Sequence, residues 1–284
     1  MFELWYSFFE TLPFNWAQYR FMQHAFLAVI LISPLFALPG CLVVSKQMAF
    51  FSDAIGHAAL TGIAIGAILG ISQPLPSMLL FAVILSVVIQ FLRRYTQASI
   101  DTVIGLVMAA SVALGVVILS RRGGFNRYSR YLIGDLLSLS QSDIIAVAIV
   151  LLIVLAVWIF FFNNLFLISF NSTIARSRGV NVWWYELFFS ALTAVIVTIS
   201  VQWIGILVIN SLLILPAAAS RNLSASLRQF VLFSLAISFV SGLSGLILSY
   251  YWATASGATI VLVAMAFYIV SFFFARRVSS GTVS

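Results

Sequence analysis

Long runs of apolar residues, separated by short polar stretches, follow one another along almost the whole chain. Most of them have about 20 residues, which is the length that an α-helix needs to cross the hydrocarbon core of a bilayer. The pattern predicts nine such helices, near residues 22–45, 53–70, 76–92, 102–120, 144–162, 187–201, 204–219, 230–249 and 258–275.

Helix breakers mark some of the boundaries between these runs. The stretch QPLP at 73–76 divides one long apolar segment, and Pro216 lies near the end of the seventh run. The runs at 187–201 and 204–219 are almost continuous, so they would equally form one long tilted helix. The sequence therefore predicts eight or nine transmembrane helices.

Composition identifies these helices as membrane spans. Of the 284 residues, 63% are hydrophobic and only 7% are charged, which a soluble domain of this length would not tolerate. We expect an all-α, polytopic membrane protein in which residues 1–284 form a single transmembrane domain and residues 1–20 an interfacial amphipathic segment. The one cysteine, Cys41, lies in an apolar run, which excludes a disulfide framework and a thiolate metal cluster.

The net charge of +7 reports membrane topology, because Lys and Arg fall in short clusters between the apolar runs. No nucleic-acid partner is expected. With nine spans and an external N-terminus, the C-terminus is cytoplasmic and nine basic residues lie inside: Lys46, Arg93, Arg94, Arg176, Arg178, Arg221, Arg228, Arg276 and Arg277. Five lie outside, namely Arg20 and the four in RRGGFNRYSR, which are Arg121, Arg122, Arg127 and Arg130. The sequence does not assign a role to that loop; anionic lipid headgroups and acidic patches on a partner protein are the two candidate contacts.

An ionisable pair lies at the edge of the second apolar run, in the stretch SDAIGH. Asp53 and His57 are four residues apart, so a helix places both side chains on one face, one turn apart. An aspartate at the centre of a membrane helix costs about 2.5 to 3.5 kcal/mol on insertion scales, so such a residue normally marks a pathway. Carboxylate and imidazole together suit Zn²⁺, Mn²⁺ or Fe²⁺.

Two readings of this pair stay open. In one, Ser52 and Asp53 only cap the helix and His57 bonds a neighbouring carbonyl. In the other, the pair binds a metal ion, and because two ligands are too few, a two-fold homodimer would combine two aspartates and two histidines. The many small residues along 54–66 predict that this helix packs closely against protein.

Other polar residues have simpler interpretations. We expect His24 to be interfacial or satisfied by hydrogen bonds, Asp101 to cap a helix and Glu186 to be a boundary residue. The stretch SGLSG at 241–245 is similar to the nucleophile motif of rhomboid intramembrane proteases, but Gly and Ser recur in membrane helices for packing. The zinc-peptidase signature H-E-x-x-H and the nucleotide-binding loop G-x-x-x-x-G-K-[ST] are absent, so this chain is not expected to be an enzyme or to bind ATP itself.

Taken together, the ordered blocks of the chain resemble the membrane-spanning permease subunits of bacterial zinc and manganese ABC importers. The resemblance covers nearly the whole chain. Its most specific parts are SKQMAFFSDAIGHAALTGIAIG at 45–66, IDTVIGLVMAASVALGV at 100–116, YLIGDLLSLSQSDI at 131–144 and VQWIGILVINSLLILPAAASR at 201–221.

The resemblance implies a homodimeric permease of the bacterial inner membrane that imports Zn²⁺, or Mn²⁺, with no cofactor of its own. Asp53 and His57 match the family's intramembrane Asp and His. Two cytoplasmic ATPase subunits would supply ATP hydrolysis, and an extracytoplasmic binding protein would deliver the metal. The chain departs from its relatives at Lys46 and Gln47, where Arg-Arg is common, at Gly56, and at Asn210, where small or hydroxyl residues are usual.

Two inner loops are candidates for contact with the ATPase. By analogy with similar importers, SRNLSASLRQ at 220–229 is expected to form a short amphipathic coupling helix, with contact residues Arg221, Asn222, Leu223, Ser224, Leu227 and Arg228. The second inner loop contributes Arg176, Arg178 and Gly179. The alternatives are a permease for cobalamin or metal chelates, against which Asp53 and His57 argue, and an ion-coupled secondary transporter, which would need no ATPase.

Overall fold

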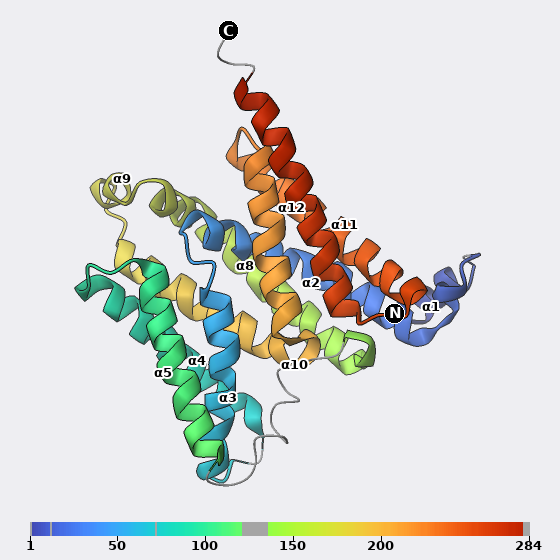
Figure 1. Cartoon of the computed structure of the whole chain (residues 1–284), viewed down its shortest axis with the longest axis horizontal. Coiled ribbons are helices and arrows are strands. Elements are labelled where there is room, and N and C mark those ends of the chain that lie inside the picture. The colour runs from blue at the N-terminus through green and yellow to red at the C-terminus, as the bar shows by residue number, and fades with distance from the viewer. Residues whose placement is uncertain (1, 12, 72, 121–135, 281–284) are drawn as a thin grey trace. The chain divides into compact units, whose positions relative to one another are not determined.

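A computed structural model describes residues 2–11, 13–71, 73–120 and 136–280 of the chain (Figure 1). The loop with Arg121, Arg122, Arg127 and Arg130 lies outside these ranges. Every regular element within them is helical: α1 (Phe2–Glu10), η1 (Asn15–Gln18), α2 (Arg20–Ser45), α3 (Phe51–Ile68), α4 (Pro74–Tyr95), α5 (Ile100–Ser120), η2 (Leu136–Ser138), α8 (Gln141–Phe170), α9 (Ser172–Ser177), α10 (Val182–Leu223), α11 (Leu227–Trp252) and α12 (Ser256–Ser280).

Eight of the described helices are long and apolar enough to span a membrane: α2, α3, α4, α5, α8, α10, α11 and α12. The predicted all-α polytopic fold is therefore confirmed. Helix α10 contains both of the runs that the sequence left ambiguous, and Gly205 interrupts it with φ 76° and ψ 161°, a backbone conformation that glycine adopts without a Cβ penalty. The two runs are thus separate helical stretches, divided at Gly205, within one element.

The chain folds into two compact units. Unit 1 comprises Met1–Cys41, Asp135–Ala156 and Ser211–Ser284, and unit 2 comprises Leu42–Gly134 and Val157–Asn210. The boundaries fall inside α2, α8 and α10. Because α2, α8 and α10 each contribute residues to both units, the expected single transmembrane domain stays a prediction that this division does not test.

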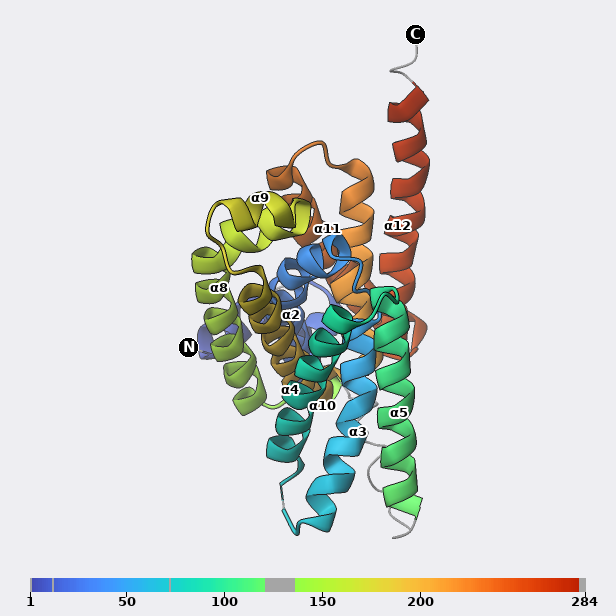
Figure 2. The ribbon, with the colours of Figure 1, turned by 90° about the vertical axis from the view of Figure 1, so that its left-hand side faces the viewer.

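In unit 2, helix α3 packs against α4 and α5, and the three lie side by side in both views (Figures 1 and 2). Glycines permit the close approach, as the small-residue pattern predicts. A Cβ on Gly62 would lie 2.8 Å from the Cα of Met78, and one on Gly115 would collide with the Thr61 hydroxyl. Thr61 donates a hydrogen bond to the Ser111 carbonyl at 2.6 Å, which ties α3 to α5.

We expect Gly62→Leu to destabilise this three-helix packing. The new side chain would meet the backbone of α4, which cannot rotate away, and overpacking of this kind typically costs about 1 to 3 kcal/mol. The matched control is Gly105→Leu, because no atom lies within 4 Å of a Cβ built at Gly105. Thermal unfolding of the purified variants in detergent should show a lower midpoint for Gly62→Leu only; equal midpoints would contradict the packing.

In unit 1, α11 and α12 pack against each other, and Gly245 allows the contact because a Cβ there would lie 2.6 Å from the Cα of Ile260. Helix α2 is held to α11 by hydroxyl groups: Ser33 donates to the Ser238 carbonyl at 3.4 Å, and Ser238 donates to the Ser33 carbonyl at 3.3 Å. Reciprocal bonds of this kind satisfy polar groups inside an apolar helix pair. The SGLSG stretch belongs to α11, where Ser241 donates to the Ser238 carbonyl and Ser244, the serine of the Gly-Leu-Ser-Gly match, donates to the Val240 carbonyl.

Candidate metal-transit site

The first turn of α3 carries Asp53. The residue before the helix, Phe50, makes no side-chain capping bond, and the buried Ser52 hydroxyl has no hydrogen-bond partner among the described residues. The capping interpretation of SDAIGH is therefore not realised as hydrogen bonds. A carboxylate in the first turn is still favoured by the positive end of the helix dipole.

Asp53 and His57 form the pair that their spacing predicts. His57 Nε2 lies 3.4 Å from Asp53 Oδ1, and the two side chains are 41% and 31% exposed. This distance is long for a hydrogen bond, so the two groups are neighbours without a tight mutual contact. Partial exposure leaves donor atoms of both residues accessible at the surface of one chain.

Asn210 is a third member of this cluster. Its Nδ2 donates to Asp53 Oδ1 at 2.6 Å, and this bond sets the orientation of the amide, because a carboxylate can only accept. The amide oxygen of Asn210 is buried and has no hydrogen-bond partner within the described ranges. Sequence reasoning marked Asn210 only as a departure from the family; the signal for its role was an amide inside the apolar stretch ILVINSLLIL.

Gly56 faces the same part of α10. A Cβ at this position would lie 3.0 Å from the side chain of Ile206. Contact of that kind is tighter than ordinary van der Waals packing, so glycine brings the start of α3 close to the segment that carries Asn210. The two positions that the resemblance marks as unusual, Gly56 and Asn210, therefore lie in the same contact between α3 and α10.

His24 is not available as a further ligand. Its Nε2 lies 2.6 Å from the Tyr6 hydroxyl, and its Nδ1 lies 3.2 Å from the carbonyl oxygen of Leu139. The carbonyl requires a proton on Nδ1, so Nε2 accepts from Tyr6. Both ring nitrogens are used in hydrogen bonds that hold α1 and Leu139, just before α8, to α2 within unit 1, which agrees with the prediction of a histidine satisfied by hydrogen bonds.

A single chain supplies too few ligands for a closed metal site. No group of three or more His, Cys, Asp or Glu side chains comes together in the described part of the chain. The cluster thus offers one carboxylate and one imidazole, oriented by an amide. Such an incomplete set can pass an ion on without trapping it, since a transport site has to bind weakly enough to release.

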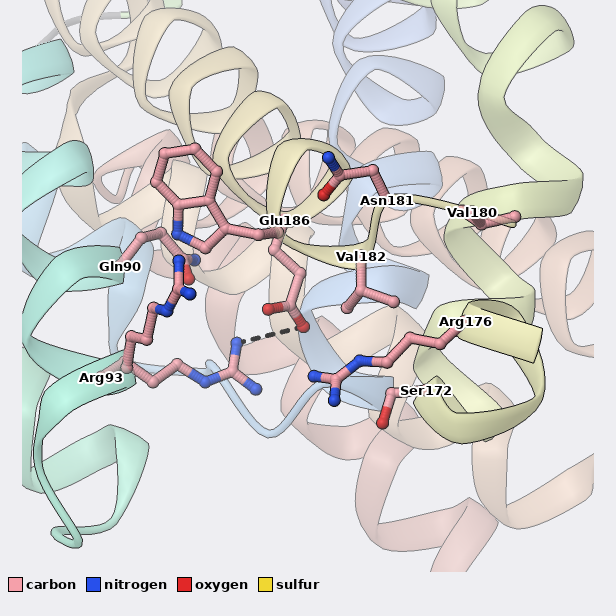
Figure 3. A pocket seen from close by; sticks show the side chains of 10 residues that line it. Gln90, Arg93, Ser172, Arg176, Val180, Asn181, Val182 and Glu186 are labelled. Atoms are coloured by element: carbon pink, nitrogen blue, oxygen red, sulfur yellow. Dashed lines mark ion pairs between the residues drawn. The ribbon is translucent and has the colours of Figure 1, made fainter. Parts of the chain in front are cut away.

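Glu186 has a larger role than the predicted boundary residue. It lies 3.5 Å from Lys46 Nζ and 3.4 Å from Arg93 Nη1, and so joins the segment after α2 and the end of α4 to the start of α10. Figure 3 shows the pair with Arg93. The Lys46 side chain is only 4% exposed. Burial lowers the pKa of Lys46, and the neighbouring Glu186 carboxylate opposes that shift. Glu186 does lie near the start of α10, as a boundary residue would, and its carboxylate in addition compensates two cations.

The predicted coupling helix at 220–229 is not a separate helix. Arg221, Asn222 and Leu223 end α10, Ser224 lies in a short connection, and Leu227 and Arg228 begin α11, whose first turn is capped by Ser226. Ser220 also donates to the carbonyl of Phe230 at 2.6 Å, which closes this corner. The prediction of an independent helix is wrong because both flanking helices continue into the segment.

A short independent helix occurs instead in the second inner loop. Helix α9 begins after Asn171, whose side chain accepts from the backbone N–H groups of Thr173 and Ile174. It ends at Arg178 and at Gly179, whose φ of 77° favours glycine. Arg176 and Arg178 are both exposed on this element.

The fold and the site together indicate the class of protein, and comparison with known families identifies the family. An ionisable pair on a helix of a multi-pass membrane protein is typical of a transport pathway, so the fold and site define a membrane transport protein. The model of the ABC 3 transport family matches residues 18–275. The chain belongs to this family.

Relatives cover almost the full chain. It is 33% identical over 258 residues to the high-affinity zinc uptake system membrane protein ZnuB of Haemophilus influenzae, covering 89% of this chain and 97% of that protein. It is 30% identical over 262 residues to the manganese import system permease protein ScaB of Streptococcus gordonii, covering 91% and 93%. Among solved structures, PsaBC from Streptococcus pneumoniae in complex with Fab matches with a TM-score of 0.77 and 25% identity, over 96% of this chain and 95% of that chain.

Proposed function

We propose that this chain is the membrane-spanning permease subunit of an ATP-driven importer of divalent transition-metal ions, with zinc as the cargo. The observation that carries the proposal is the Asp53–His57 pair, partly exposed and oriented by Asn210, in a chain of the ABC 3 transport family. The relatives named for zinc and for manganese support a metal ion as substrate. Oxygen and nitrogen ligands suit both metals, and the zinc assignment rests on the resemblance.

The partners follow from what the chain lacks. Its sequence contains no phosphate-binding loop, so ATP hydrolysis is assigned to two cytoplasmic ATPase subunits. An extracytoplasmic metal-binding protein delivers the ion in this scheme. Contact with the ATPases is assigned to α9 with Arg176, Arg178 and Gly179, and to the corner at 220–229.

A homodimer completes the metal site in the proposed mechanism. Each chain offers one carboxylate and one imidazole, and a two-fold axis near α3 would bring four ligands together. Closure of the ATPase pair on ATP moves the contact segments and opens the site alternately to each side of the membrane. Separation of the two protomers breaks the ligand set, and the ion leaves toward the cytoplasm.

Uptake and co-purification test this function together. Cells that express the chain with its ATPase and binding protein should accumulate labelled zinc, and an excess of unlabelled manganese should compete because the donor atoms suit both ions. The ATPase should co-purify with the tagged permease. Uptake that persists without any ATPase would indicate a secondary transporter, and uptake of a metal chelate but not of the free ion would indicate a chelate permease.

A further inference from the structure

A cavity of about 590 Å³ lies within unit 2, beside the ion pair of Glu186 (Figure 3). It is bounded by the end of α4, by the loop around α9 and by the start of α10. The side chains that matter for its chemistry are Gln90, Arg93, Arg94, Arg176, Trp183 and Glu186. This cavity is distinct from the cluster of Asp53, His57 and Asn210, none of which lines it.

Cations outnumber anions in this lining. Three arginines face one carboxylate, and Glu186 is already shared between Arg93 and Lys46. Neither Arg94 nor Arg176 has a carboxylate partner among the residues that the structure describes, and both are exposed. The Arg94 guanidinium lies 5.9 Å from the ring centroids of both Tyr95 and Trp183, and such cation–π contacts occupy its face. The N–H groups of Arg94 and Arg176 can still bind an anion that enters from solvent, in the bidentate geometry that arginine favours with phosphate.

Hydrogen-bond donors are also in excess. The buried indole N–H of Trp183 has no hydrogen-bond partner in the described ranges, and Nη1 of Arg93, although close to Glu186, makes no hydrogen bond there. A buried donor without an acceptor is costly, and each such group calls for an explanation. Both donors belong to residues that line the cavity, but the two atoms themselves are closed to water. A side-chain shift that opens them to the cavity would let one bound anion with several acceptor oxygens accept from both.

The surroundings of the cavity point to the membrane surface. Large exposed apolar side chains lie on α4 and α10, with Tyr95 67% and Trp184 59% exposed, and Phe170 at the end of α8, next to α9, is 72% exposed. Aromatic residues of this kind gather where membrane helices reach the headgroup region. Arginine pockets between helices at that level are suited to anionic headgroups.

We propose that this cavity binds a phosphate group, and that its source is the headgroup of an anionic phospholipid of the cytoplasmic leaflet. Arg94 and Arg176 bind the phosphate oxygens, the Trp183 N–H donates to one of them, and the exposed aromatic side chains contact the acyl chains. Bound lipid then links α4 to the second inner loop, which is assigned above to the ATPase. The phosphate site itself does not depend on the transported metal.

Lipid titration followed by native mass spectrometry tests the proposal. Delipidated full-length chain in detergent is titrated with phosphatidylglycerol, with phosphatidylcholine and with inorganic phosphate. Phosphatidylglycerol should bind more tightly than phosphatidylcholine, and Arg176→Gln and Arg94→Gln should each weaken it about tenfold, as expected for the loss of a charge-assisted hydrogen bond. Arg178→Gln is the matched control, because Arg178 lies in the same loop but does not line the cavity.

Each other outcome has a definite meaning. If inorganic phosphate binds with the same arginine dependence and phosphatidylglycerol binds no tighter, the phosphate site stands and its source is soluble. If both lipids bind equally, or if all three variants lose binding equally, the phosphate site is refuted. If Arg94→Gln and Arg176→Gln release the ATPase while lipid binding is unchanged, the cavity is a protein docking site and the proposal is wrong.

Discussion

Asp53→Asn is expected to lower the initial rate of labelled zinc uptake at least tenfold while the ATPase remains bound to the permease. Asparagine keeps the size of the side chain and its hydrogen bond to Asn210 can be retained in part, but it removes the negative charge. A neutral amide binds a divalent transition metal more weakly than a carboxylate does. Loss of even a residue that only hydrogen-bonds to a metal ligand typically lowers metal affinity or activity about 10- to 100-fold. In a homodimer the change removes two ligands at once.

The experiment compares variants at matched membrane levels. Uptake of labelled zinc is measured for wild type, Asp53→Asn, His57→Gln and a control, Asp101→Asn, which changes the same charge in the first turn of α5. Asp101 is exposed and does not belong to the cluster of Asp53, His57 and Asn210, so the control variant should transport normally. If Asp53→Asn and His57→Gln transport at the rate of wild type, the pair has a packing role and the transit site must be sought elsewhere.

Glu186→Gln is expected to destabilise the protein by about 3 kcal/mol, because it leaves two cations without their shared anion. Lys46 is only 4% exposed, and Arg93 is also partly buried. Removal of one partner from a buried ion pair typically costs about 3 to 5 kcal/mol, and the 20% exposure of Glu186 favours the lower end of that range. Thermal unfolding in detergent should therefore show a clearly lower midpoint.

A second substitution separates charge loss from misfolding. Lys46→Met in the Glu186→Gln background removes the buried cation, so the double variant should recover a large part of the lost stability. Methionine can fill the space of the lysine stem without a charge. If Glu186→Gln unfolds at the temperature of wild type, or if the double variant is the least stable of the set, the ion pairs do not stabilise the start of α10.

Local spacing was enough to predict part of the site. Asp53 and His57 are one turn apart on the same helix, so their proximity follows from the geometry of α3 alone. The hydrogen bond from Asn210 joins residues 157 positions apart, and no local pattern could reveal it. The same is true of Glu186, whose two cationic partners come from the ends of other helices.

The fold, too, was predictable where it depends on local sequence and unpredictable where it depends on distant contacts. Apolar runs located the spans, because a bilayer demands about 20 apolar residues for each crossing. The prediction of a coupling helix was wrong because an amphipathic pattern over ten residues does not show whether the flanking helices extend into the segment. The break in α10 depends on one backbone conformation, that of Gly205, which the residue permits but does not require.

By itself, the sequence determined the class of protein, the approximate spans and the ionisable pair of α3, since hydropathy and helical periodicity act over short stretches of chain. Only the tertiary structure decided which distant groups orient or neutralise one another. Asn210 donates a hydrogen bond to Asp53, and Lys46 and Arg93 both pair with Glu186. The physical reason is that a buried charge or amide in an apolar protein must find a partner, and the partner is chosen by helix packing and not by proximity in the sequence.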